Sequence, residues 1–412
     1  MKITLLLFSV FYLLLPIGTT AQIAGCTDPL ANNYNPTATQ NDGSCTYNSA
    51  SNIPTASFIL AANLTETSGL ITWNNQIWTH NDSDDLNLYS LDSSNGTLLK
   101  SYTLSGVTNT DWEEISQDED FMYVGDFGNN RNGNRTDLKI LRIGKNSILA
   151  GSPFIETINF SYSNQANYTP AGSNNTDFDC EAFIVSADSI FLFTKQWISK
   201  KTSVYALPKT PGTYIANLKS TFDIQGLITG ATYLEQKNLI ILSGYSIDLQ
   251  PFVSLLYDFN GNNFFSGNRR KIEVSLPFHQ VEGIATADGL KYYISNESFS
   301  QPPYISIPQK LHILDLSDYL TGYLYNPVWL QETRKIDNDI LFPNPVTDFI
   351  NLKPDKYHLP ATYRIVNQSG QIVLRGKLMQ ENQGIDISEL HAGVYIIKID
   401  DENLQSFKVI KR

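Results

Sequence analysis

Five copies of one short pattern run through the middle of the chain, and this repeat constrains the fold more than any other feature. In each copy a mostly apolar stretch leads, after a turn, to a second apolar stretch. The clearest copy is the last, residues 281–285 followed by 291–297. The other four are 67–71 with 77–81, 111–116 with 122–126, 180–184 with 191–195, and 228–232 with 240–244. Recurrence at intervals of roughly 45 to 70 residues predicts a repeat architecture.

Each unit reads as four strands, and four-stranded units arranged around an axis make a β-propeller. The last unit lacks a fourth strand of its own, so residues 56–63 are expected to supply it and close the ring. The sequence therefore predicts an all-β fold, with a five-bladed propeller over 56–325. A degenerate sixth blade within 144–176 stays open. Third strands are expected at 86–91, 138–143, 203–207, 254–259 and 311–316, and fourth strands at 98–104, 154–160, 218–222 and 271–276.

Composition agrees with an ordered chain that is rich in strands. The 412 residues include 22 Tyr and 21 Phe but only 3 Met, and 17% are charged. This length allows two or three domains. The formal net charge of −12 argues against nucleic acid as a partner, because phosphate binding needs clustered Lys and Arg.

The N-terminus predicts export. Residues 1–21 have the form of a signal peptide: Lys2 supplies the positive start, 5–15 is apolar, and 19–21 are small cleavage-site residues. The apolar run is too short for a comfortable membrane span, and no later stretch is longer. We expect a secreted or cell-surface protein without a transmembrane segment in the mature chain. An alternative is a lipoprotein signal at 23–26, but Cys26 has another explanation.

Residues 22–50 form a short segment in which Cys26 and Cys45 are expected to make a disulfide, the default in an exported chain. Its Asp and Asn residues predict turns, with calcium binding as the rival reading. This segment resembles a Cys-paired motif common in secreted proteins of the Bacteroidetes. Cys180, in an apolar strand, is expected to be a buried inert thiol.

Residues 56–325 resemble a family of bacterial propeller-like proteins of undefined activity. Four motifs carry the likeness: Ser-Gly-Leu at 68–70, His-Asn-Asp-Ser at 80–83, Asp-Trp-Glu-Glu-Ile at 111–115, and a Gly-Asp stretch at 125–130. Glu114 departs from the family, where Asp is usual. The Gly- and Asn-rich residues 125–135 are expected to form an exposed turn, with a calcium or sugar site at the propeller mouth as the alternative.

After a linker at 326–338, residues 339–412 alternate with period two between turn residues, which predicts a small antiparallel β-sandwich. The opening Pro343-Asn344-Pro345, the strand that begins at Gly393 and the Lys-rich end resemble the type A C-terminal sorting domain of type IX secretion cargo in the Bacteroidetes. The resemblance implies contact with the type IX machinery and transport across the outer membrane. It often also implies removal of the domain and attachment to the cell surface.

Aligning the repeats brings chemistry-bearing residues into columns. Innermost strands of a propeller line its channel, so one position per blade should face the axis. The first-strand column reads Ser68, Glu113, Glu181, Thr229 and Glu282. The second-strand column reads Asn81, Asp126, Lys195, Gly244 and Asn296, followed by Asp82, Phe127, Gln196, Tyr245 and Glu297.

Three interpretations of this ring compete. Lys195 could neutralise the carboxylates and plug the channel, with Glu113 and Glu282 bonding backbone amides between blades. Glu113, Glu181 and Glu282 could instead hold Ca²⁺, which suits all-oxygen ligands. The same metal could also activate water in a hydrolase acting on an ester, phosphate or lactone. We expect a binding module for an extracellular glycan or protein, with the metal-assisted hydrolase as the alternative.

Overall fold

The chain, in a computed structural model, divides into two compact units, Met1–Pro327 and Val328–Arg412. The structure describes residues 22–83, 85–325, 341–343, 345–352, 359–367, 372–380, 383–400 and 405–412. The expected signal peptide at 1–21 and the expected linker at 326–338 lie outside these residues. In the described part of the chain no helix is long and apolar enough to span a membrane.

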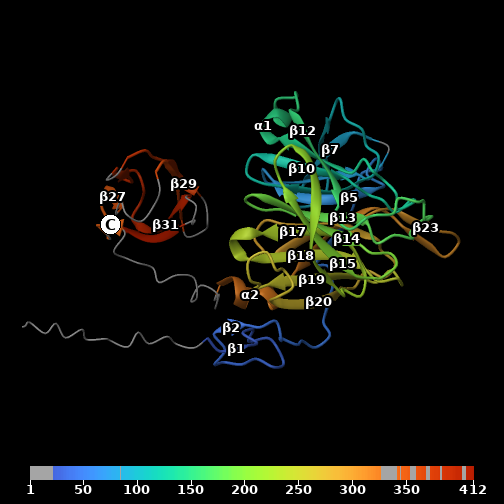
Figure 1. The fold of residues 1–412 in the computed structure, drawn as a ribbon, viewed down its shortest axis with the longest axis horizontal. Coiled ribbons are helices and arrows are strands. Elements are labelled where there is room, and N and C mark those ends of the chain that lie inside the picture. Colours follow the sequence, from blue (N-terminus) through green and yellow to red (C-terminus); the bar gives the residue numbers. More distant parts are fainter. Residues whose placement is uncertain are drawn as a thin grey trace, which may run out of the picture. The chain divides into compact units, whose positions relative to one another are not determined.

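Five successive groups of four antiparallel strands make up most of the first unit (Figure 1). We number these four-stranded groups in chain order as units one to five. The two compact parts of the chain, Met1–Pro327 and Val328–Arg412, remain the first unit and the second unit. Each expected strand of the repeat is present, within a few residues of its predicted bounds. The strands are β5 (Thr67–Trp73), β6 (Gln76–Asn81), β7 (Asn87–Asp92) and β8 (Leu98–Thr103); β9 (Trp112–Gln117), β10 (Phe121–Asp126), β11 (Lys139–Gly144) and β12 (Ile155–Tyr162); β13 (Asp179–Val185), β14 (Ser189–Lys195), β15 (Thr202–Pro208) and β16 (Gly212–Phe222); β17 (Leu227–Leu234), β18 (Leu239–Tyr245), β19 (Pro251–Tyr257) and β20 (Asn268–Val274); and β21 (Val281–Thr286), β22 (Lys291–Asn296), β25 (Lys310–Asp315) and β4 (Ala56–Ile59).

The ring closes as the sequence predicts, because β4 from the N-terminus pairs antiparallel with β25 and completes unit five. A side-chain relay that runs inward from the surface supports this seam: Ser57 Oγ lies 2.7 Å from His312 Nδ1, and the buried His312 Nε2 lies 2.8 Å from Asn296 Oδ1. The first strands β5, β9, β13, β17 and β21 contact one another in succession, and β21 contacts β5. This closure leaves β25 without a free edge.

Apolar packing between neighbouring units holds the ring together. Five hydrophobic clusters each lie between two consecutive units, including one between unit five and unit one that contains Leu70, Ile77 and Leu311. Strands β18 and β19 are buried along their whole length, which explains why they read as continuous apolar runs rather than as alternating patterns. Each fully buried large apolar side chain stabilises the fold by roughly 1.5–3 kcal/mol.

The remaining elements of the ring region are insertions. Residues 144–176, where a further blade was open, hold helix α1 (Lys145–Leu149) and β12, the fourth strand of unit two; the described residues form no additional sheet there. Strand β12 also pairs in parallel with β16, so units two and three share one continuous sheet. A short hairpin, β23 (Phe299–Gln301) and β24 (Ile305–Ile307), extends the loop between β22 and β25. A 3₁₀ turn (Glu235–Lys237) and helix α2 (Ser317–Tyr325) complete the region.

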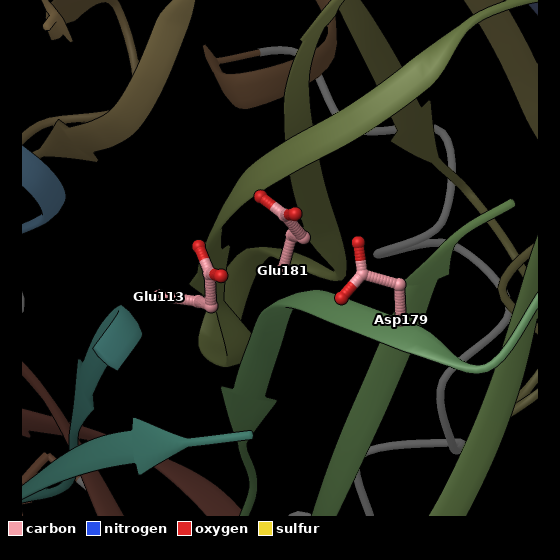
Figure 2. Close-up of side chains that lie close together, drawn as sticks. All are labelled: Glu113, Asp179 and Glu181. Atoms are coloured by element: carbon pink, nitrogen blue, oxygen red, sulfur yellow. The ribbon is translucent and has the colours of Figure 1, made fainter. Parts of the chain in front are cut away.

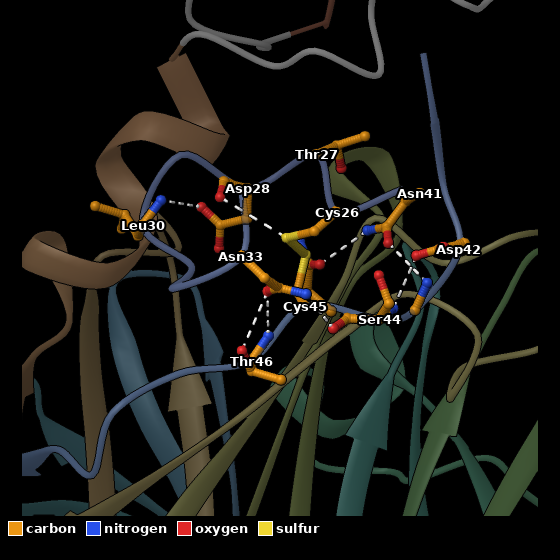
Figure 3. The surroundings of a disulfide bond; sticks show 12 residues. Cys26, Thr27, Asp28, Leu30, Asn33, Asn41, Asp42, Ser44, Cys45 and Thr46 are labelled. Atoms are coloured by element: carbon orange, nitrogen blue, oxygen red, sulfur yellow. Dashed lines mark hydrogen bonds between the residues drawn. A yellow bond between two sulfur atoms is a disulfide. The ribbon is translucent and has the colours of Figure 1, made fainter. Parts of the chain in front are cut away.

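The Cys-stapled segment docks on unit four. The predicted disulfide joins Cys26 and Cys45, next to the short strands β1 (Ala24–Gly25) and β2 (Gln40–Asn41) (Figure 3). Asp28 Oδ2 accepts hydrogen bonds from the Tyr257 hydroxyl at 2.5 Å and from the Tyr47 hydroxyl at 2.7 Å. Between this segment and the ring, the short strand β3 (Ser51–Asn52) pairs in parallel with β20, so residues 48–55, which have the composition of a linker, are partly structured.

The polar side chains of this segment act as turn formers. Asn41 Oδ1 accepts from the Gly43 N–H and Asp42 Oδ1 from the Ser44 N–H, both at 2.9 Å, and Asn33 Oδ1 accepts from the Thr46 N–H (Figure 3). These bonds use the oxygens that a calcium ion would need, so they bear out the turn reading. Cys180 is free and fully buried in β13, as expected for an inert thiol.

The C-terminal compact unit, Val328–Arg412, consists of two antiparallel sheets around one hydrophobic core, as the predicted sandwich requires. One sheet has the order β26 (Leu341–Phe342), β27 (Phe349–Leu352), β30 (Ile385–Asp386), and the other β29 (Ile372–Leu378), β28 (Ala361–Val366), β31 (Gly393–Asp400), β32 (Gln405–Lys411). Both sheets contribute to the core, for example through Ile350, Ile365 and Val409.

We expect the Cys26→Ser, Cys45→Ser double variant to release the N-terminal segment from unit four. The disulfide spans a sequence separation of 19, and closing a loop of this size stabilises by about 3 kcal/mol. Limited proteolysis should cut within 26–45 at least tenfold faster than in wild type, while the ring stays resistant. The Cys180→Ser variant, which loses a free thiol, serves as the control. Unchanged cleavage within 26–45 would contradict the stapling role.

Candidate functional site

A β-bulge places the first-strand column in every unit. The register between first and second strands shifts at the same position of all five pairs. In unit three, for example, Cys180 pairs with Thr194 and Ala182 with Phe193, which leaves Glu181 between them without a partner. A bulge re-aims a side chain and is common beside functional sites. The bulged positions include all the predicted column residues Ser68, Glu113, Glu181, Thr229 and Glu282.

The column divides into two kinds of residue. The hydroxyls bond to the backbone of a neighbouring first strand: Ser68 Oγ donates to the Glu113 carbonyl, and Thr229 Oγ1 donates to the Val281 carbonyl at 2.6 Å. The glutamates face a cavity instead. Thr229 is therefore a link between units four and five, whereas Ser68 makes a similar link and also lines the cavity.

That cavity, the axial cavity, has a volume of about 170 Å³. Six carboxyl groups but only one lysine line it. Its other lining residues are polar or aromatic and come from first strands, from the ends of second strands and from the loops next to them. The lining is Glu66, Ser68, Asp82, Glu113, Asn130, Asn174, Glu181, Lys195, Trp197, Tyr245, Gln280, Glu282 and Glu297.

Glu113, Asp179 and Glu181 form the tightest group of carboxylates at this cavity. One oxygen from each lies within 4.8 Å of the others, and all three residues are buried. Figure 2 shows their carboxyl groups on the same side of the strands that carry them. The predicted set was Glu113, Glu181 and Glu282; Glu282 lines the same cavity but lies outside this group, and Asp179 takes its place.

Hydrogen bonds hold two of the three carboxylates in position. Asp179 accepts from the Asn129 N–H at 2.6 Å and from the Trp197 indole N–H at 2.7 Å. Glu181 Oε2 pairs with Lys195 Nζ at 3.1 Å, so the predicted neutralising lysine does meet a carboxylate. Glu181 Oε1 is buried and has no hydrogen-bond partner among the described residues. One lysine therefore satisfies only part of this group.

Sequence reasoning missed Asp179, although a signal was available. Side chains two apart in a strand share a face, and the residues two positions before the first-strand column are Glu66, Asp111, Asp179, Leu227 and Gln280. Four of these five are polar, and Glu66 and Gln280 line the cavity. Applied to the column, this alternation would have added Glu66, Asp111, Asp179 and Gln280 to the candidate site residues.

Burial and mutual repulsion raise the pKa of the cavity carboxyl groups. Burial, strengthened by the hydrogen bond to Glu66, raises the pKa of Asp82 to about 8. Burial also raises the pKa of Glu297 to about 7 and that of Asp111 to about 6, where the charge of Asp179 adds to it. The pKa values of Glu113, Asp179 and Glu282 rise well above the ordinary range, first through burial. A cavity without a cation therefore retains protons at neutral pH.

Glu114 seals the ring next to the cavity, a role the sequence did not reveal. Its fully buried carboxylate accepts from the Ala231 N–H at 2.7 Å and from the Ile115 N–H at 3.0 Å, which links units two and four. The carboxylate fits only because the facing position of unit one is Gly69, where a Cβ would lie 2.2 Å from Glu114 Oε1. The bonding of backbone amides that was predicted for Glu113 and Glu282 belongs to this residue instead.

The second-strand column mostly stabilises loops. Asp126 pairs with Arg135 at 2.8 Å and Lys139 at 2.7 Å. Asn81 donates to the Asn63 carbonyl, and Asn296 donates to the Pro308 carbonyl. Of the predicted residues in this column, Lys195 alone lines the cavity. Three residues that each directly follow a column position, Asp82, Tyr245 and Glu297, line it too.

The structure also places His80, from the His-Asn-Asp-Ser motif, and the Gly- and Asn-rich stretch 125–135. His80 is fully buried with Nδ1 3.0 Å from the Asn81 carbonyl, and burial lowers its pKa to about 4, as for a structural histidine. Within the Gly- and Asn-rich stretch 125–135, Phe127 and Asn129 are buried and Asn130 lines the cavity, so it is only partly an exposed turn.

An apolar groove of about 260 Å³ adjoins the axial cavity. The two share Trp197, Tyr245 and Gln280 as a common wall. The groove is lined by Trp197, Lys200, Leu227, Tyr245, Ser246, Ile247, Leu249, Gln280 and Phe299.

Residues 340–412 match the secretion system C-terminal sorting domain, which confirms the resemblance found in the sequence. The chain is type IX secretion cargo, and this domain indicates secretion to the outer surface or the extracellular space. A search of curated proteins found no significant match.

Solved structures with a similar mostly β fold include WD40 and other propeller proteins. PorZ, a surface component of the type IX secretion system of Porphyromonas gingivalis, is 12% identical over 84% of this chain, with a TM-score of 0.31; the chain covers 45% of PorZ, less than half its length. The WD40 repeats of RRP9 are 8% identical (64% of this chain, 99% of that one, TM-score 0.35). The Pan2 WD40 domain of Neurospora crassa is 10% identical (62% and 64%, TM-score 0.30). Nothing about ligands or activity follows from such distant likenesses.

We expect the protein in EDTA to lose stability as the pH rises from 5 to 8. A carboxyl group whose folded-state pKa lies above its unfolded value stabilises the fold while protonated and loses this contribution as the pH passes through the folded value. For Asp111, Glu297 and Asp82 those values are about 6, 7 and 8. The melting temperature should fall by roughly 5 °C or more. Combining Asp82→Asn with Glu297→Gln should flatten the profile, whereas the exposed control Asp223→Asn should not. A profile that rises over this range would contradict the raised pKa values.

Proposed function

Starting from an exported chain that carries a type IX sorting domain, we propose that the first unit is a cell-surface or secreted binding module. Its ligand site is the mouth of the axial cavity, and a Ca²⁺ ion held by Glu113, Asp179 and Glu181 forms its base. The observation that carries this proposal is the imbalance of charge in the cavity, where six carboxyl groups face one lysine.

The architecture we propose for this module is a five-bladed β-propeller over 56–325. The five four-stranded units support it, as do the five apolar clusters, one between each pair of consecutive units. A closed ring gives every unit two neighbours, so the first strands converge on one axis. This convergence explains how the bulged residues of four of the five units, Ser68, Glu113, Glu181 and Glu282, reach a common cavity.

Two features support calcium rather than a softer metal. The donors are all oxygens, and hard cations such as Ca²⁺ prefer carboxylate ligands in sites of six to eight oxygens. In addition, Glu181 Oε1 is buried and has no hydrogen-bond partner among the described residues. A divalent ion at the three carboxylates would supply the missing positive charge and leave room for water or ligand oxygens.

We expect wild type to bind one Ca²⁺, measured by calorimetry and by metal analysis after dialysis, and to gain about 5 °C in melting temperature at saturating Ca²⁺. Glu113→Gln and Asp179→Asn should each remove binding and this gain, because each takes one charge from the group. The matched control is Glu273→Gln, an exposed position on β20. If wild type binds no calcium while Glu113→Gln is as stable or more so, the group is a proton-sharing plug and the metal part of the proposal fails.

A second candidate, a metal-assisted hydrolase, is favoured by one specific observation. Asp82 and Glu297, whose pKa values lie at about 8 and 7, line the same cavity as the proposed ion. Carboxyl groups tuned to this range suit general acid–base catalysis, and the ion would lower the pKa of a bound water. Esters, phosphates and lactones are the substrate classes that such a site would take.

A panel of p-nitrophenyl esters, p-nitrophenyl phosphate and γ- and δ-lactones with Ca²⁺ present tests this candidate. If the site is catalytic, Glu297→Gln should lower kcat about 100-fold or more, with little change for Glu273→Gln. Absence of turnover above the background of the Glu113→Gln variant would leave the binding module as the function.

A further inference from the structure

We propose that the mouth of the axial cavity binds an extended polypeptide through a basic side chain and a neighbouring apolar side chain. The basic group enters the cavity, and the apolar one enters the adjoining groove. This inference rests on the proposed function, since it names the ligand class of that same site. The part of the cavity it uses is formed by Glu66, Asp82, Glu282 and Glu297, none of which belongs to the proposed calcium ligands.

The largely buried Glu282 and one buried oxygen of Asp82 make this side of the cavity a receptor for a cation. The Glu282 side chain belongs to a residue only 8% exposed, and none of the described residues donates a hydrogen bond to its carboxyl group or pairs with it. Asp82 Oδ1 is likewise buried without a partner. Lys and Arg are pure hydrogen-bond donors, and Arg presents a planar fork that matches two carboxylates at once.

The groove supplies the apolar half. Leu227, Ile247, Leu249 and Phe299 contribute hydrophobic walls, and Ile247 is 68% exposed. Because Trp197, Tyr245 and Gln280 border both spaces, a ligand can occupy them with adjacent groups. Charge on one side and apolar surface on the other therefore select an amphipathic occupant.

The loops around the groove are built for contact. Leu249 and Phe278 have φ values of 56° and 65°, in the left-handed region that large side chains rarely adopt. The Phe278 N–H donates to the Leu249 carbonyl at 2.9 Å, which fixes the two loops against each other. Backbone strain of this kind gathers at ligand sites.

Exposed hydrophobic side chains on the loops of units three to five enlarge the surface. Ile198, Phe278 and Tyr304 are 62%, 48% and 90% exposed. Tyr304 lies at the turn of the β23–β24 hairpin, which projects from the body of the ring (Figure 1).

The surroundings of Trp197 favour a polypeptide over a glycan. Sugars stack on open aromatic faces, but here Lys195 Nζ lies 4.7 Å and Lys200 Nζ 5.9 Å from the Trp197 ring centre. The indole N–H is also committed to Asp179. The apolar walls that remain are mainly aliphatic, and they match a leucine or phenylalanine side chain better than a sugar ring.

The test uses the mature full-length chain with saturating Ca²⁺ and four blocked peptides, measured by calorimetry. The two parents are acetyl-Gly-Gly-Arg-Leu-Gly-Gly-amide and its Leu-Arg counterpart. The other two are variants of a parent that binds. One replaces Arg by citrulline, which keeps the shape and removes the charge, and the other replaces Leu by Gly. At least one parent should bind, and each replacement should weaken that binding about tenfold or more.

Protein variants test separately the cavity, which is proposed to take the basic side chain, and the groove, which is proposed to take the apolar side chain. Glu297→Gln should weaken the Arg parent about tenfold and leave the citrulline peptide unchanged. Ile247→Ser should weaken the parent but not the Gly-substituted peptide, and the matched control Ile215→Ser, an equally exposed apolar position on β16, should change neither.

Three results would overturn the proposal: no binding of either parent at 5 mM peptide, equal binding of the Arg and citrulline peptides, or binding of neutral maltohexaose that Ile247→Ser removes. Failure of the calcium site is distinguishable. If Glu113→Gln loses Ca²⁺ while Glu297 still discriminates Arg from citrulline, the peptide site stands without the ion.

Discussion

Repulsion between carboxyl groups on one axis is the constraint that the rest of the first unit accommodates. Glu113, Asp179 and Glu181 place oxygens within 4.8 Å of one another in a buried setting, where like charges interact far more strongly than in water. Raised pKa values and the pairing of Glu181 with Lys195 relieve part of this repulsion. Apolar packing between every pair of consecutive units and the β4–β25 seam hold the strands together around it.

The polar links across the axis show how closely the ring and its cavity depend on each other. Ser68 and Thr229 fasten their strands to the next ones through backbone carbonyls, and Glu114 joins two units through backbone amides. These residues occupy the same bulged stretch as the cavity glutamates. A single backbone irregularity therefore serves two purposes: it places side chains that link neighbouring strands and side chains that line the cavity.

Lysine pairing explains part of the cavity but not all of it. Lys195 meets Glu181, as a plugged channel would require. Burial raises the pKa of Asp82, Glu113 and Glu282, which favours their neutral, protonated forms. Such a cavity gains from any cation that enters, whether a metal ion at one side or a basic side chain at the other. The adjoining groove then restricts which organic cation fits.

The sequence by itself determined the strands, the four-strand unit, the N-terminal closure, the Cys26–Cys45 bridge and the C-terminal sorting domain, because each depends on local alternation, turn residues or a short motif. It also brought Glu113, Glu181 and Glu282 to one column, since units that repeat place equivalent residues alike. Only the tertiary structure decided which of them lie together. Asp179 replaces Glu282 beside the other two, Asp126 pairs with its own loop, and Glu114 seals the ring. These outcomes depend on the bulge in each first strand and on loops from different units that meet at the mouth of the cavity. The spacing of the repeat predicts neither of them.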